Sequence, residues 1–205
     1  MLYNLNPTVL ENVFTDDEYK IIYEEINNKN INSVLTFQNV QNNYFRKVID
    51  FGYISTGIDN QNIINKLKNI AEKIFNTELS NPMIHFARYT NYSGAKPELA
   101  PHVDVFLEKP SYTISIQLDT TKPQWVIRVD DHKFCLNKNS LITFSGTHQV
   151  HSRDILPFKD NDYCDIIVCQ FQKLNEEYNK NLKEDEDHKK IIDFKFKDHI
   201  KKYRV

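Results

Sequence analysis

The sequence predicts an α+β protein with a double-stranded β-helix, or jelly-roll, core, N-terminal flanking helices and a charged, helical C-terminal tail. Two segments in the first third of the chain place apolar residues at helical spacing. From Met83 onward, short strand-like segments alternate with turn-forming residues, as in sandwiches and barrels. A His-x-Asp triplet at His102 and a later pair of histidines stand between these strands.

The chain length of 205 residues suits one domain with a sizeable core, so we expect a single domain over residues 1–205. Within it, residues 1–80 are interpreted as helical support with a possible lid. Residues 81–173 are expected to form the β-helix core, and residues 174–205 the charged tail.

Composition narrows the range of partners and compartments. The formal net charge is −2 and the pI is near 6.4, which gives no electrostatic reason to expect nucleic-acid or membrane binding. No apolar run is long enough to span a bilayer, and the first residues do not resemble a signal peptide. Three cysteines without metal-type spacing favour a reducing, cytoplasmic setting.

Two helices are expected before the core. Thr15 is the predicted N-cap of the first, with Glu18 completing a capping box. The second is expected from about Asn60 to Phe75, because its apolar residues recur on one face. Between the helices, residues 34–54 are expected to hold one or two strands.

The core strands are recognised by short apolar or alternating runs bounded by turn residues. They are expected at Met83–Tyr89, Tyr112–Leu118, Trp125–Val129, Ser140–Phe144 and Tyr163–Phe171. The final part of the charged tail is interpreted as either a docked helix or an oligomer contact, so a dimer is possible; its apolar residues are Ile191, Ile192, Phe194, Phe196, Ile200 and Tyr203.

The triplet His102-Val103-Asp104 places an imidazole and a carboxylate on the same side of an extended segment. One more histidine from a distant strand would complete a 2-His-1-carboxylate facial triad, the set typical of non-haem Fe(II). The segment Phe144–His151 supplies two candidates, His148 and His151.

Together these residues resemble the Fe(II)/2-oxoglutarate-dependent dioxygenases, in particular the prolyl-hydroxylase-like branch. The resemblance covers about residues 83–171. It rests on Tyr92-Ser93-Gly94 before Pro101–Asp104, on Ile116–Asp119 and Ser140–Phe144, and on His151 followed by Pro157. The resemblance implies that His102, Asp104 and His151 bind Fe(II). His148 is the competing third ligand; His151 is preferred because residues 152–157 resemble the family's segment after its distal histidine.

The resemblance also implies that 2-oxoglutarate and O2 are co-substrates, with ascorbate as a supporting reductant. The far carboxylate of 2-oxoglutarate needs a cation, ideally a bidentate arginine. The chain departs from the family here, because Asp162 stands where a basic residue is usual. Arg153 and Lys159 are the alternatives. Arg153 is favoured because it lies two residues after His151, so both side chains face the barrel interior if the strand continues. Tyr92 and Gln117 are the other expected contacts.

The expected reaction is hydroxylation of an unactivated C–H bond, with release of succinate and CO2. The substrate is either a peptide or protein side chain or a small metabolite. Two other readings stay open: a cupin-type metal enzyme that does not use 2-oxoglutarate, and a non-catalytic jelly-roll binding module.

Overall fold

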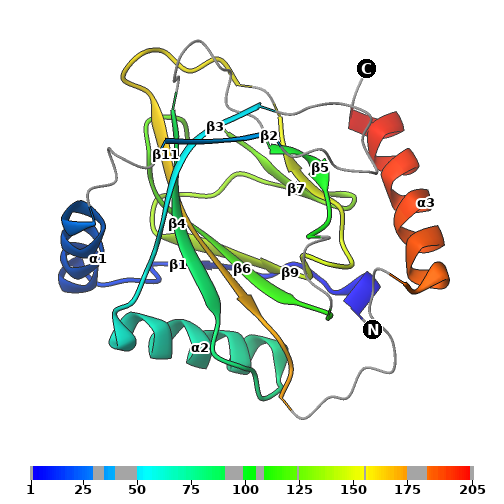
Figure 1. Cartoon of the computed structure of the whole chain (residues 1–205), viewed down its shortest axis with the longest axis horizontal. Helices are drawn as coiled ribbons and strands as arrows, with labels where there is room; N and C mark the ends of the chain where they lie inside the picture. The colour runs from blue at the N-terminus through cyan, green and yellow to red at the C-terminus, as the bar shows by residue number, and fades with distance from the viewer. Residues whose placement is uncertain are drawn as a thin grey trace.

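The computed structural model describes residues 2–29, 35–39, 50–90, 99–104, 109–123, 125–154, 156–174 and 184–203 (Figure 1). Its helices are η1 (Leu2–Asn4), α1 (Asp16–Asn28), α2 (Gln61–Phe75) and α3 (Glu186–Tyr203). Its strands are β1 (Val9–Glu11), β2 (Leu35–Asn39), β3 (Asp50–Gly57), β4 (Met83–Thr90), β5 (Leu99–His102), β6 (Tyr112–Thr120), β7 (Ile127–Val129), β8 (His132–Phe134), β9 (Ser140–Phe144), β10 (His151–Arg153) and β11 (Tyr163–Phe171).

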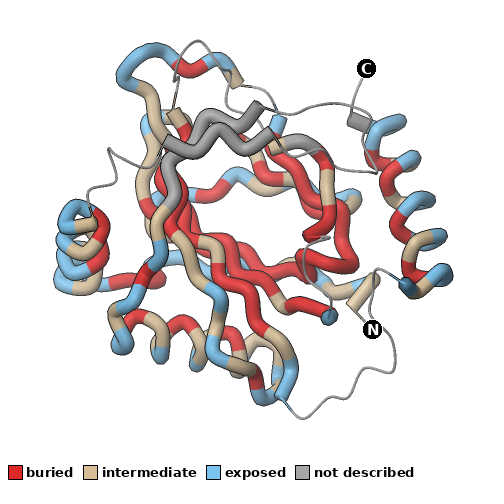
Figure 2. Tube along the Cα trace, in the orientation of Figure 1, coloured by how far each residue is buried: buried red, intermediate tan, exposed pale blue. Residues whose placement is uncertain are grey.

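The strands form two antiparallel sheets that face each other. The larger has the order β1-β9-β6-β11-β4-β3-β2, and the smaller has the order β5-β10-β7-β8. Strands β4 to β11 therefore cross repeatedly between the sheets, which is the topology of a double-stranded β-helix. The predicted fold class is confirmed. Buried residues follow the facing strands of both sheets (Figure 2).

Helices α1 and α2 cover the outer face of the larger sheet. Helix α1 begins with the predicted capping box between Thr15 and Glu18, and α2 begins after Asn60, whose side chain accepts from the Asn62 and Ile63 amides. Apolar residues of both helices share one buried cluster with outward-facing residues of β6, β9 and β11; it includes Ile22, Ile26, Ile63, Leu67, Ile114, Ile116, Leu141 and Ile167. The outward face of this sheet is therefore taken up by packing, which leaves its inner face for a site.

The longer predicted strands all form, although β7 begins at Ile127 rather than Trp125. The short strands β1, β5 and β8 were not predicted, because three or four residues are too few for a period of two to be recognised. Strand β10 was expected only as a continuation of a strand through His151 and Arg153. Residues 1–80 contribute β1, β2 and β3 to the larger sheet as well as the expected helices.

The tail forms helix α3, which docks against the smaller sheet. Ile192 and Phe196 pack with Val103 and Val150 in a buried cluster. The docked-helix interpretation of the tail therefore agrees with the contacts. Among the described helices, none has the length and apolar character needed to cross a membrane.

Candidate metal centre

The metal-ligand candidates come from two neighbouring strands of the smaller sheet. Strand β10 lies between β5 and β7, and His151 is paired directly with His102. Their rings are 4.1 Å apart between centroids. Asp104 lies two residues after His102, just beyond the end of β5, so its carboxylate lies close to the two histidines. The register of this sheet therefore brings His151 next to His102 and Asp104, although about half of the core sequence lies between them.

The three side chains converge on one point. Asp104 Oδ1 lies 3.7 Å from His102 Nε2 and 3.6 Å from His151 Nε2. One ligand atom from each residue lies within 4.8 Å of the others. Two donors about 2.1 Å from one ion lie roughly 3.0–3.5 Å apart, so small movements would close the set around a metal. The donor types, two imidazoles and one carboxylate, fit non-haem Fe(II).

Asp104 is held in place by groups that leave Oδ1 free for a metal. Gln170 Nε2 donates to Asp104 Oδ2 at 2.7 Å, and the Asp104 amide donates to the Gly146 carbonyl at 2.8 Å. The residue is only 5% exposed. Burial raises the pKa of Asp104 above its ordinary value, despite the opposing effects of His102 and Gln170. A cation beside it would relieve this cost.

His151 is prepared to bind a metal through Nε2. Its Nδ1 lies 3.1 Å from the Gln149 carbonyl, which can only accept, so Nδ1 carries the proton and Nε2 keeps its lone pair. Burial, followed by the nearby His102, holds the pKa of His151 well below its usual range. The ring is therefore neutral at neutral pH, as a metal ligand must be.

His148, the competing candidate, is not part of the cluster. Its Nδ1 lies 2.8 Å from Thr147 Oγ1, and its ring contacts Tyr3 and His188. Burial, with a smaller effect of His188, lowers the pKa of His148 to about 3. It serves as a packed polar residue between the turn before β10 and the tail.

Arg153 lies in the barrel interior, on the same strand as His151. It is 1% exposed, and Nη1 donates to the Trp125 carbonyl at 2.8 Å and to Gln117 Oε1 at 3.3 Å. Its Nη2 is buried and has no hydrogen-bond partner among the described residues. No carboxylate in the described part of the chain forms an ion pair with it. A buried cation with a free donor is a site for an anionic ligand.

The walls around Arg153 are apolar. The guanidinium carbon lies 4.8 Å from the centre of the Trp125 ring, and Tyr89 meets the same ring edge-on at 4.9 Å. Ala87, Phe158 and Ile166 complete this buried cluster. Two residues along a strand span about 6.6 Å, so the metal ligands and Arg153 are separated by the length of a small dicarboxylate.

The other sequence candidates have different positions. Gln117 is fully buried; it accepts from Arg153 and donates to the Leu136 carbonyl. Lys159 is exposed in the turn before β11, where its amide donates to Asp162. Asp162 pairs with Lys122 at 2.8 Å, which explains an acidic residue at that position. Tyr92 lies outside the described residues.

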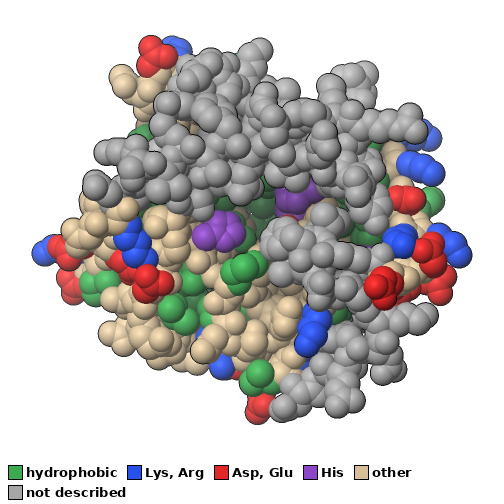
Figure 3. Space-filling view, viewed as in Figure 1, with side chains coloured by type: hydrophobic (Ala, Val, Ile, Leu, Met, Phe, Trp, Pro, Cys, Tyr) green, Lys and Arg blue, Asp and Glu red, His purple; other side chains and the backbone are tan. Residues whose placement is uncertain are grey.

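Histidine surface is visible near the centre of the face shown in Figure 3. His102 is the ligand candidate that keeps some exposure, with 23% of its side chain accessible. The site is therefore open on the His102 side and closed on the sides of Asp104 and His151.

Comparison with known proteins gives structural matches. No family profile and no curated sequence matches the chain. The viral collagen prolyl hydroxylase of Paramecium Bursaria Chlorella virus-1, solved as a 2OG complex, has a TM-score of 0.57 at 11% identity over 85% of this chain and 99% of its own. A Trichoplax adhaerens prolyl hydroxylase bound to a hypoxia inducible factor peptide has a TM-score of 0.57 at 13% identity over 83% and 85%. The alpha ketoglutarate dependent epimerase SnoN, from nogalamycin biosynthesis, has a TM-score of 0.57 at 12% identity over 82% and 78%.

The chain has the fold of the 2OG-Fe(II) oxygenases. Solved structures with that fold include a protein described by this family name from Burkholderia pseudomallei, with a TM-score of 0.54 at 13% identity. At such identity the likeness establishes the fold, and the activity has to be argued from the residues of the site.

Two residues of this oxygenase-fold site were missed from the sequence. Gln170 holds Asp104 from the far end of β11, and Gly146 lies against the same carboxylate: a Cβ there would be 1.9 Å from Asp104 Oδ2. The chain has only four glycines, so a glycine beside the distal histidines was a signal of close approach. Gln170 gave no comparable signal.

Replacing Asp104 by Asn is expected to stabilise the metal-free protein at pH 7 and to abolish metal binding. The folded-state pKa of Asp104 is raised, so ionisation destabilises the fold as pH rises above about 4, the ordinary value of the unfolded state. The neutral amide removes this cost. Thermal melts of both proteins at pH 7 without metal show whether the variant is more stable. Each kcal/mol of unfolding free energy changes the melting temperature by about 2–4 °C. A lower melting temperature for the variant would contradict it.

Replacing Gln170 by Leu is expected to weaken metal binding about 10-fold, because Asp104 Oδ2 loses its donor. Gln172→Leu is the matched control, since Gln172 lies beyond β11 and its bonds to Ser80 come from its backbone. Titration with Mn(II) measures both. Equal affinities in the two variants would remove Gln170 from the support of Asp104.

Proposed function

We propose that the chain is an Fe(II)- and 2-oxoglutarate-dependent dioxygenase that hydroxylates an unactivated C–H bond. The observation that carries this proposal is the pairing of two features on β10. His151 belongs to the ligand set, and Arg153, two residues later, offers a buried donor without a partner. A metal enzyme that does not use an anionic co-substrate has no need of such a cation.

Each residue has a stated part in the proposal. His102, Asp104 and His151 would hold Fe(II) on one face and leave the opposite face for co-substrate and O2. Arg153, oriented by Gln117, would bind the far carboxylate of 2-oxoglutarate, and the aromatic wall of Trp125 and Tyr89 would exclude water. When bound, the iron and 2-oxoglutarate supply the oxidative chemistry, with succinate and CO2 as by-products.

The proposed substrate is either a peptide or protein side chain or a small metabolite. The Trichoplax adhaerens protein was solved with a peptide fragment, which supports a peptide or protein side chain. The epimerase SnoN supports a small metabolite instead. A cytoplasmic location, support by ascorbate, the single-domain organisation and a dimer through the tail are further predictions from the sequence.

The decisive experiment measures succinate formed from 2-oxoglutarate by the purified protein with Fe(II), ascorbate and air. We expect slow, iron-dependent succinate formation without added substrate, and faster formation when a peptide or metabolite panel contains the substrate. The controls are the wild-type protein assayed under anaerobic conditions and the Asp104→Ala variant assayed in air. Neither should form succinate. Absence of succinate, together with 2-oxoglutarate binding that Mn(II) does not tighten, would exclude the proposal.

A further inference from the structure

The reverse side of the ligand-bearing segments is covered by a single helix, α3. Val103 lies between His102 and Asp104, and Val150 directly precedes His151. Both valines are buried and pack with Ile192 and Phe196 of α3. Because neighbours along an extended chain point to opposite sides, these valines are the outward counterparts of the inward-facing ligands.

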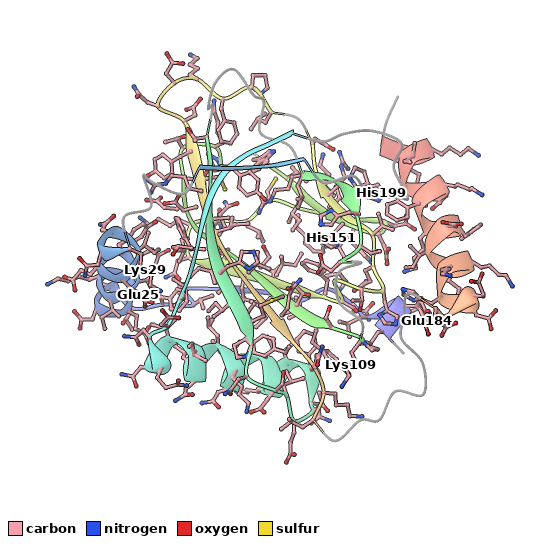
Figure 4. All side chains as sticks on the ribbon, in the orientation of Figure 1. Glu25, Lys29, Lys109, His151, Glu184 and His199 are labelled. Carbon is pink, nitrogen blue, oxygen red and sulfur yellow. The ribbon has the colours of Figure 1, made fainter. Side chains whose placement is uncertain are left out.

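A hydrogen bond extends this contact to the residue between His151 and Arg153. Ser152 Oγ lies 3.0 Å from Nε2 of His199 on α3, and both residues are buried. Ile192, Phe196 and His199 follow one another at helical spacing, so they form one stripe along α3. In Figure 4, His199 lies between α3 and the strands that carry His151.

An ion pair ties the same helix to the residue before His151. Lys195 Nζ of α3 binds Asp130 Oδ2 at 2.6 Å and the Tyr3 carbonyl at 2.6 Å. Asp130 in turn holds both backbone groups of Val150: Oδ1 accepts from the Val150 amide at 3.0 Å, and the Asp130 amide donates to the Val150 carbonyl at 2.7 Å. Each ligand-bearing segment therefore has a contact with α3 next to its ligand.

The strands alone give weak control over the position of the ligands. Strand β5 has four residues and β10 has three, and their ladder is irregular between His151 and Arg153. Few backbone hydrogen bonds therefore fix their register. Ligands must be held within about 0.5 Å of the productive geometry for full affinity, so packing from outside has to supply the remaining constraint.

We propose that α3 is the positioning element of the metal centre. Its residues Ile192, Phe196 and His199 contact the reverse side of the ligand-bearing strands. These contacts fix the distances between the ligand atoms of His102, Asp104 and His151. This role rests on the proposed metal-binding function, and it gives the charged tail a purpose beyond capping the fold. Ile192, Phe196 and His199 are positioning residues, because they act through Val103, Val150 and Ser152.

The test compares His199→Ala with Ile63→Val in the full chain. Ile63 belongs to α2 and is buried in the cluster between that helix and the larger sheet, so its substitution lowers stability without touching α3. Co(II) affinity and the visible spectrum of bound Co(II) are measured beside the melting temperature. We expect His199→Ala to weaken Co(II) binding about 10-fold and to change the spectrum. Ile63→Val should lower the melting temperature and leave both Co(II) readouts unchanged.

Two further variants make the outcome decisive. His199→Gln keeps a side-chain amide that can reach Ser152 and should recover most of the Co(II) affinity. Ser152→Ala removes the same bond from the strand side, so it replaces His199→Ala if that variant does not fold. A His199→Ala protein with a lower melting temperature but wild-type Co(II) affinity and spectrum would overturn the positioning role. Failure of the wild-type chain to bind Co(II) would instead overturn the metal centre itself.

Discussion

Replacing Gly146 by Ala is expected to reduce metal affinity by at least about 100-fold, although the added group is a single methyl. The new Cβ would lie 1.9 Å from Asp104 Oδ2 and 2.8 Å from Thr113 Oγ1. Neither neighbour can yield easily, because Gln170 holds the carboxylate and the Gly146 amide donates to Thr113 Oγ1. The carboxylate must turn away from the histidines, and a displaced ligand costs more than a lost supporting bond.

Gly57 provides the matched control for this substitution. A Cβ at Gly57 meets Asp59 Oδ1 at 4.0 Å, which is ordinary contact, so Gly57→Ala should bind Mn(II) with wild-type affinity. Titration with Mn(II) gives the affinities, and thermal melts check that Gly146→Ala remains folded; overpacking alone costs about 1–3 kcal/mol. Wild-type Mn(II) affinity in Gly146→Ala would show that Asp104 is not a ligand.

Replacing Arg153 by Met is expected to weaken 2-oxoglutarate binding at least about 30-fold, which corresponds to a loss of about 2 kcal/mol or more. Met fills a similar volume, so the aromatic wall around Trp125 is kept while the positive charge is lost. The substitution removes a buried cation that has no anionic partner among the described residues, but it also removes the bonds that Arg153 donates to the Trp125 carbonyl and to Gln117. These two effects on stability oppose each other, so the expected result is weak co-substrate binding with little change in the melting temperature.

Lys159 offers the comparison that separates the two cationic candidates. Lys159 is exposed in the turn before β11, so Lys159→Met should bind 2-oxoglutarate as the wild type does. Binding is measured by titration of the Mn(II)-loaded protein with 2-oxoglutarate. The reverse pattern, with tight binding in Arg153→Met and weak binding in Lys159→Met, would move the carboxylate site out of the barrel.

Local patterns were sufficient for much of the fold. The capping box at Thr15 and the apolar face of α2 depend on residues within one or two turns, and both appear where they were predicted. Strand β6 alternates between apolar and other residues over its first eight positions, and the eight or nine residues of β4 and β11 contain short apolar runs, so all three were recognised. The short strands β5 and β10 carry most of the site and have no such signal, because three or four residues contain too few two-residue repeats to be distinguished from chance.

The chemistry of the site was readable because ligand type and local spacing are properties of the sequence. His102 and Asp104 are two residues apart on an extended segment, so they share a side wherever that segment lies. For the same reason, His151 and Arg153 were expected to face one interior. These statements need no knowledge of the partner strands.

Which of the competing histidines lies beside His102 and Asp104 was decided only by the tertiary structure. The pairing of β10 with β5 sets His151 opposite His102, whereas His148 lies in the turn before the strand and meets Tyr3 and His188. Gln170 reaches Asp104 across 66 positions of sequence, and α3 reaches Ser152 across 47. Such contacts depend on strand register and on the packing of whole elements. Chemical type and alternation are local, but register is a property of the assembled barrel.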